Sequence, residues 1–93
     1  PLDKMQIKQI VNLQINDVQK RLTDNGITLK VTPSAIDFLA SAGYDPEFGA
    51  RPVKRAVQHY LLNDLSKKLL AEDIDRSKPI MIDSFGDGLV FHN

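Results

Sequence analysis

The chain has 93 residues, of which 42% are hydrophobic and 26% charged, a composition that suits one small globular domain. Its 12 basic and 12 acidic residues give zero net charge, which argues against a general nucleic-acid-binding protein. The absence of cysteine excludes disulfides and thiolate metal sites, and no apolar run approaches the roughly 20 residues of a membrane span.

The first predicted helix covers residues 3–24. Its apolar residues recur at steps of three and four, which is the spacing of one helix face, and Gly26 suits the left-handed position that ends a helix. Because no a/d repeat is sustained, we interpret this stripe as part of the core rather than as a coiled coil. The stripe consists of Ile7, Val11, Ile15, Val18 and Leu22.

Residues 27–31 read Ile-Thr-Leu-Lys-Val, and this alternation of apolar and polar residues predicts a half-buried strand. Thr32 and Pro33 then supply a cap and a first-turn proline for a short helix that ends before Gly43. This helix is expected to bury its apolar side chains Ile36, Phe38 and Leu39.

A third helix is predicted to begin at Pro52, whose fixed φ and missing N–H suit the first helical position. The pair Asn63-Asp64 interrupts its apolar pattern and predicts a kink or a break. A first apolar face consists of Val53, Val57 and Leu61, and a second, slightly rotated face of Leu62, Leu65 and Leu69.

The final region opens at Pro79, and Gly86-Asp87-Gly88 is a turn signal between two extended runs. Ile80 and Ile82 share one strand face, and residues 89–91 form the return strand. The order helix, strand, helix, helix, hairpin predicts an α+β fold, with about three to four helices packed on one side of a small sheet. We expect residues 1–93 to form a single domain and, because the chain starts without an initiator methionine, to be a fragment or processed product.

Three cations, Arg51, Lys54 and Arg55, cluster where the third helix is predicted to begin. The N-terminal end of a helix carries a partial positive charge, so exposed cations there oppose the dipole by roughly 0.3–1 kcal/mol each. The same end is suited to an anion, above all phosphate, because its backbone N–H groups are free. The residues alone leave two interpretations open, a phosphate contact and a solvated surface.

No set of residues supports catalysis by this chain alone. The serines lie in no nucleophile-elbow sequence, and no glycine-rich loop is followed by Lys-Ser or Lys-Thr. Asp73 and Asp75 begin like a calcium loop, but Lys78 occupies the position that requires glycine, so an EF-hand is rejected. A phosphate contact without a cradle for the nucleotide implies that the rest of such a site lies on another domain.

The segment from Gly43 to Arg55, Gly-Tyr-Asp-Pro-Glu-Phe-Gly-Ala-Arg-Pro-Val-Lys-Arg, resembles the sensor-2 segment of the Clp family of AAA+ ATPases. The similarity continues through residues 56–65 and, upstream, through Pro1-Leu2 and residues 10–22. Within the family, the chain is most similar to the C-terminal small subdomain of the second ATPase module of ClpB-type disaggregase chaperones. Two alternatives stay open: the lid domain of a protease-associated Clp unfoldase, and a stand-alone protein-interaction module.

By this resemblance, Arg51 occupies the sensor-2 position and would contact the γ-phosphate of ATP bound mainly by the large subdomain of the same module. Gly49 and Ala50 would leave room for the nucleotide, and Lys54 and Arg55 would add positive potential or hold a domain interface. The family's Walker motifs are absent from this chain. We therefore expect no ATP hydrolysis by the fragment, whereas the parent would be an ATPase whose Mg²⁺ is not bound by this domain.

The resemblance also implies partners for the domain. It would pack against the large AAA+ subdomain of the same chain and of the neighbouring subunit. The parent would be a cytoplasmic homohexamer that acts on aggregated proteins, with a co-chaperone system engaged through other domains. Neither nucleic acid nor a membrane is an expected partner. Many relatives have Asn-Pro where this chain has Asn63-Asp64, so the helix break is expected to be weaker here.

Overall fold

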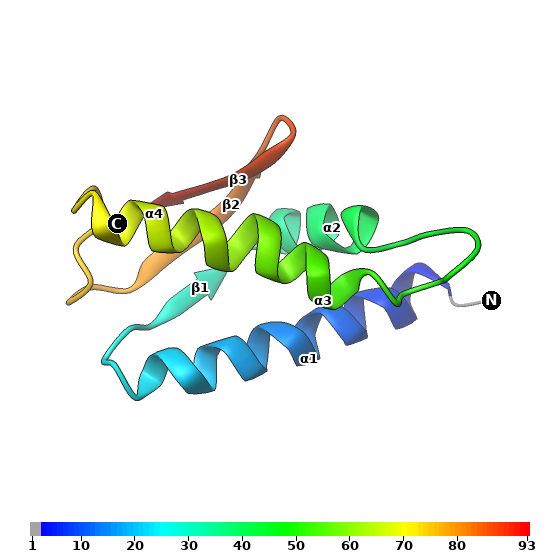
Figure 1. Ribbon diagram of the computed structural model, residues 1–93, viewed down its shortest axis with the longest axis horizontal. Coiled ribbons are helices and arrows are strands. Elements are labelled where there is room, and N and C mark those ends of the chain that lie inside the picture. Colours follow the sequence, from blue (N-terminus) through cyan, green and yellow to red (C-terminus); the bar gives the residue numbers. More distant parts are fainter. Residues whose placement is uncertain (1–2) are drawn as a thin grey trace.

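The computed structural model describes residues 3–93, so the Pro1-Leu2 pair of the resemblance lies outside the described residues. Three helical regions pack on a three-stranded sheet, which confirms the predicted α+β class (Figure 1). The elements are α1 (Lys4–Thr23), β1 (Leu29–Val31), α2 (Pro33–Ala42), α3 (Val53–Ala56), the π-helix η1 (Val57–Asn63), α4 (Asp64–Leu70), β2 (Ile80–Phe85) and β3 (Gly88–His92).

The sheet has the order β1-β2-β3 and is mixed. Strand β1 runs parallel to β2, and β2 and β3 form the predicted antiparallel hairpin. Phe85 pairs with Gly88, so the hairpin loop is the two-residue Gly86-Asp87, with Gly86 at φ 61° as such tight turns require. Strand β1 is shorter than predicted, because only three of its residues pair with β2.

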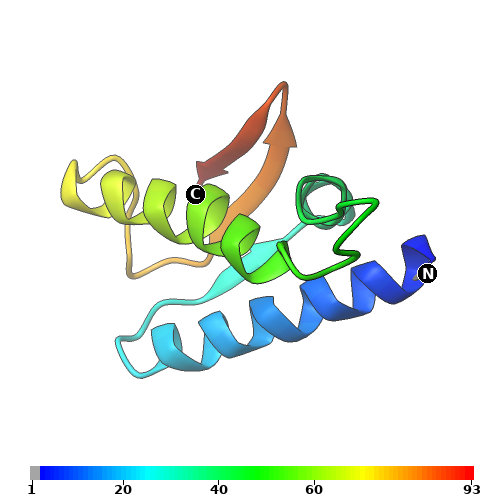
Figure 2. The ribbon, with the colours of Figure 1, turned by 45° about the vertical axis from the view of Figure 1, so that its right-hand side comes forward.

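One face of the sheet is covered by the helices and the other is open. Ile80, Ile82 and Leu89 are buried on the covered face, whereas Phe85 at the hairpin end is 79% exposed. In Figures 1 and 2 the tip of the hairpin projects away from the helices, and α1 lies beside the start of the long helical rod at α3. The core stripe predicted for α1 is confirmed: Ile7, Val11, Ile15 and Val18 are buried and Leu22 is half-buried.

Helix α2 begins as predicted, with Thr32 as its cap. The Thr32 hydroxyl accepts a hydrogen bond from the Ala35 N–H at 3.1 Å and donates one to Asp83 Oδ1 at 2.8 Å, which ties the helix start to β2. The predicted core face of α2 is only partly right. Leu39 is buried, but its buried neighbours are Ala35 and Ala40, while Ile36 and Phe38 are half-buried.

The predicted kink or break at Asn63-Asp64 is wrong. Both residues have helical dihedral angles, and Val53 to Leu70 form one continuous rod whose middle is a π-helix (Figures 1 and 2). The physical reason is the spacing of the buried residues Val53, Val57, Leu61 and Leu65, which are all four apart. An α-helix turns about 100° per residue, so three steps of four would rotate this stripe by about 120°. The wider π-helix winds less per residue and keeps the four side chains on one face.

Among residues 3–93, no helix combines the length and the apolar character needed to cross a bilayer.

Candidate functional site

A loop, residues 43–52, connects α2 to α3. The cationic segment, Arg51 to Arg55, begins at the end of this loop and continues into α3. A pair of backbone hydrogen bonds closes this loop, from the Asp45 N–H to the Gly49 oxygen at 2.8 Å and from the Gly49 N–H to the Asp45 oxygen at 2.6 Å. The Asp45 carboxylate also accepts hydrogen bonds from the backbone N–H groups of Glu47 and Phe48 at 2.7 and 3.0 Å. Gly49 has a φ of 65°, a conformation that favours glycine. The loop therefore has a defined shape.

Gly43 brings the two helices that flank this loop into direct contact. A Cβ atom at Gly43 would lie 2.7 Å from the Val53 Cα and 2.8 Å from its Cγ2. The φ of Gly43 is −94°, which any residue adopts, so the glycine is required by the close approach of α3 rather than by its backbone conformation. The sequence predicted only that Gly43 stops α2. Its contact with Val53, ten residues later, could not be read from local patterns.

Arg51 lies in the turn before α3, one residue further from the helix than predicted, because the helix begins at Val53 rather than at Pro52. Pro52 is the N-cap, with φ −75° and ψ 0°, and Val53 is the first helical residue. The Arg51 N–H donates to the Phe48 oxygen at 3.3 Å, and its exposed guanidinium carbon lies 5.5 Å from the centroid of the Phe48 ring. This is the distance range of a cation–π interaction.

The cations of this segment have no carboxylate partner within the described part of the chain. The one ion pair among residues 3–93 joins Lys8 to Asp37 on α1 and α2, at 2.6 Å. The backbone N–H groups of Lys54 and Arg55 also find no hydrogen-bond acceptor in this range. The exposed side chains of Arg51, Lys54 and Arg55 thus present positive charge at the start of the helical rod, which suits an anion from outside the domain.

The structure does not bring all the predicted site residues together. Gly49 and Ala50 are half-buried beside Arg51 in the chain. Lys54 instead borders a small groove against α1, together with Arg21 and Asp17. Lys54 therefore lies toward α1, and its role at a domain interface stays a prediction.

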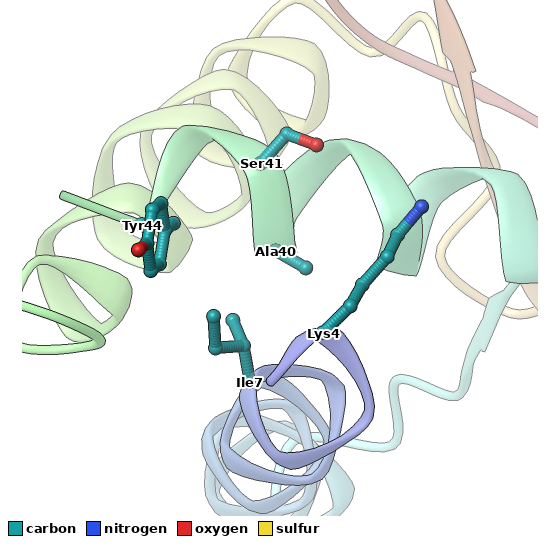
Figure 3. Close-up of a pocket in the computed structure, with 5 residues that line it drawn as sticks. All are labelled: Lys4, Ile7, Ala40, Ser41 and Tyr44. Carbon is teal, nitrogen blue, oxygen red and sulfur yellow. The ribbon is translucent and has the colours of Figure 1, made fainter. Parts of the chain in front are cut away.

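A pocket of about 400 Å³ opens between the start of α1 and the end of α2, next to the loop that leads to Arg51 (Figure 3). Figure 3 shows Lys4 and Ile7 extending from α1 toward α2, where Ala40 and Ser41 lie, with Tyr44 just beyond the end of that helix. Arg51 does not line this pocket. Of its lining residues, the sequence singled out only Ile7, as core, and Tyr44, as part of the sensor-2-like segment.

No metal centre is found in the described range, since residues 3–93 contain no group of three or more His, Cys, Asp or Glu side chains suited to holding an ion. The carboxyl groups whose pKa departs from the ordinary value lie outside the cationic segment. The pKa of Asp83 is lowered because the Thr32 hydroxyl and then the Ser84 N–H donate hydrogen bonds to it.

Residues 2–82 match the family model described as the C-terminal, D2-small domain of ClpB protein. The chain belongs to the ClpB D2-small family. The match includes the entire segment from Gly43 to Arg55 and ends within β2. It favours the ClpB assignment over the protease-associated alternative, and the observed α+β fold is consistent with an AAA+ small domain.

Curated relatives support the same D2-small assignment. The chain is 64% identical to the chaperone protein ClpB of Bacteroides thetaiotaomicron and 45% identical to that of Porphyromonas gingivalis, in each case over the whole chain and 11% of the relative. It is 49% identical over 84 residues to the chaperone protein ClpB2, chloroplastic, of Oryza sativa, which is 90% of this chain and 9% of that protein. The chain thus spans about a tenth of the length of these ClpB relatives.

Proposed function

We propose that this domain is the lid and sensor-2 unit of an ATP-dependent protein disaggregase, and that Arg51 contacts the γ-phosphate of ATP. The observation that carries the proposal is that the Arg51 side chain is exposed and unpaired within the described residues. Its guanidinium is exposed, has no carboxylate partner among residues 3–93, and lies on a defined turn before α3. Membership of the ClpB D2-small family supplies the context in which such a cation meets a nucleotide.

Gly49 and Ala50 leave space next to this contact. A Cβ atom at Gly49 would meet no atom within 4 Å, so the domain leaves open space on that side of the backbone. A nucleotide held mainly by the large domain could approach the backbone there without a steric conflict. We propose that the large domain holds ATP with its Mg²⁺ and that Arg51 completes the site from this domain.

The remaining part of the proposal concerns assembly. Lys54 and Arg55 are exposed on α3, and we propose that they contact the large domain of the same chain or of a neighbouring subunit in a hexameric ring. The parent protein is proposed to hydrolyse ATP and act on aggregated proteins in the cytoplasm, whereas residues 1–93 are proposed to form one domain without ATPase activity of its own. Neither nucleic acid nor a membrane is proposed as a partner.

The test is ATP turnover and reactivation of an aggregated model substrate by the full-length parent, comparing the wild type with Arg51→Ala. Arg76→Ala is the matched control, because Arg76 is also exposed but lies in the α4–β2 loop at the opposite end of the domain (Figure 1). We expect Arg51→Ala to lower both activities while the ring still assembles, and Arg76→Ala to retain them. If Arg51→Ala unfolds the domain instead, Arg51 is structural and the sensor role loses its support.

A further inference from the structure

Phe48 is an aromatic residue that the core does not explain. It is 52% exposed and does not belong to the set of side chains packed against the hydrophobic core. Phe38, by contrast, packs edge-on against Tyr60 with 5.0 Å between ring centroids. The ring of Phe48 is therefore available for a contact outside the core.

The loop holds Phe48 in place through its backbone. Two hydrogen bonds to the Asp45 carboxylate fix the N–H groups of Glu47 and Phe48, at 2.7 and 3.0 Å. The reciprocal backbone bonds of Asp45 and Gly49 close the loop on the far side of Phe48, at 2.8 and 2.6 Å. The ring therefore projects from a backbone that is restrained on both sides.

Phe48 makes two contacts with Arg51. The Phe48 backbone oxygen accepts a hydrogen bond from the Arg51 N–H at 3.3 Å, and its ring lies 5.5 Å below the guanidinium carbon. Arginine is among the side chains that lose most rotamer freedom when they are ordered. A ring that already confines the guanidinium removes part of this cost before a phosphate arrives.

We infer that Phe48 is a positioning residue for Arg51, with the Asp45 carboxylate fixing the turn from which the ring projects. This inference rests on the proposed contact between Arg51 and the γ-phosphate of ATP. Phe48 acts through Arg51 and touches no nucleotide itself. Its effect is therefore confined to ATP, because ADP has no γ-phosphate for Arg51 to contact.

The test compares ATP and ADP affinities of the full-length parent carrying Phe48→Leu, which removes the π face, with Phe48→Tyr, which keeps it. Phe85→Leu is the matched control, because Phe85 is 79% exposed at the hairpin end, away from the cationic segment. We expect Phe48→Leu to weaken ATP binding about two- to fivefold, the effect of losing an exposed cation–π pair, with ADP binding unchanged. Phe48→Tyr should retain the wild-type affinity for ATP, and Phe85→Leu should not change this affinity.

A double-mutant cycle separates this inference from the proposed function. In an Arg51→Ala background, Phe48→Leu should have no further effect on ATP affinity, because the residue through which it acts is gone. If Arg51→Ala weakens ATP binding but Phe48→Leu does not, Phe48 is no positioning residue although the sensor role stands. Tighter ATP binding by Phe48→Leu would also overturn the inference, since the ring would then hold Arg51 away from the phosphate. If Arg51→Ala has no effect, the proposed function itself fails.

Discussion

Replacing Gly43 with alanine tests whether the contact between α2 and α3 is as close as the structure shows. The new Cβ atom would lie 2.7 Å from the Val53 Cα, 2.8 Å from its Cγ2 and 3.1 Å from the Leu39 oxygen. Two of these three atoms belong to the backbone, so no change of rotamer relieves the overlap. We expect α3 to be displaced from α2, and the turn that carries Arg51 to be displaced with it.

The magnitude follows from two opposing contributions. Overpacking of this kind costs about 1–3 kcal/mol. Replacing glycine by alanine at an ordinary φ, here −94°, stabilises by about 0.4–1 kcal/mol through the unfolded chain. The midpoints of these ranges differ by about 1.3 kcal/mol, so we expect Gly43→Ala to lower the free energy of unfolding by about that amount, which for a domain of this size lowers Tm by about 5–10 °C.

The assay is thermal unfolding of the 93-residue chain followed by circular dichroism, with Gly88→Ala as the matched control. Gly88 does not have a positive φ, and a Cβ atom there would meet nothing within 4 Å, so its replacement should leave Tm unchanged or slightly raised. If the two variants have the same Tm, α2 and α3 are not in the close contact described, and the account of how the Arg51 turn is placed is wrong.

Two further predictions concern the helices. Thr32→Val should lower the free energy of unfolding by about 1–2 kcal/mol in urea titrations, because the α2 cap and the hydrogen bond to Asp83 are both lost; an unchanged urea midpoint would contradict this. The hydrogen bond from the Thr32 hydroxyl is the largest cause of the lowered folded-state pKa of Asp83. The stability that this bond supplies is present above about pH 3.9 and is lost as the pH falls through the lower folded value, so Thr32→Val should weaken this acid-dependent loss. Deleting the exposed Gln58 shortens the step from Val57 to Leu61 to three residues, so the variant should fold with a regular α-helix in place of η1. NMR hydrogen-bond couplings measure this, and couplings that still showed π-type bonding would contradict the spacing argument.

Much of the fold could be predicted because its signals are local. The stripe on α1, the Thr32 cap and the Gly86-Asp87 turn each lie within a few residues, and each is found where the sequence placed it. The π-helix η1 was not predicted, because the sequence was compared with the 3.6-residue period of an α-helix. With that period, apolar residues spaced four apart drift around the helix and are divided between two faces. Only the buried set observed in the structure shows that Leu65 continues the face of Val53, Val57 and Leu61.

In the candidate site, too, local features could be predicted from the sequence and tertiary contacts could not. Arg51 is a candidate from its motif and from its place before a helix, both of which are local features. The role of Gly43 depends on its contact with Val53, and the role inferred for Phe48 depends on the Arg51 guanidinium that lies over its ring. The pocket beside Tyr44 joins α1 to α2, and no sequence pattern connects Lys4 with Ser41. Contacts between residues so far apart in the sequence become visible only in the folded structure.

The ratio of ATP to ADP affinity in the full-length parent tests the central claim most directly. The claim predicts that Arg51→Ala weakens ATP binding by roughly ten- to a hundredfold, the value of a lost charge-assisted hydrogen bond, and leaves ADP binding and ring assembly intact. Arg76→Ala, with the same loss of an exposed charge, should leave both affinities unchanged. An unchanged ratio in Arg51→Ala, or an equal loss for both nucleotides, would contradict the claim that Arg51 senses the γ-phosphate.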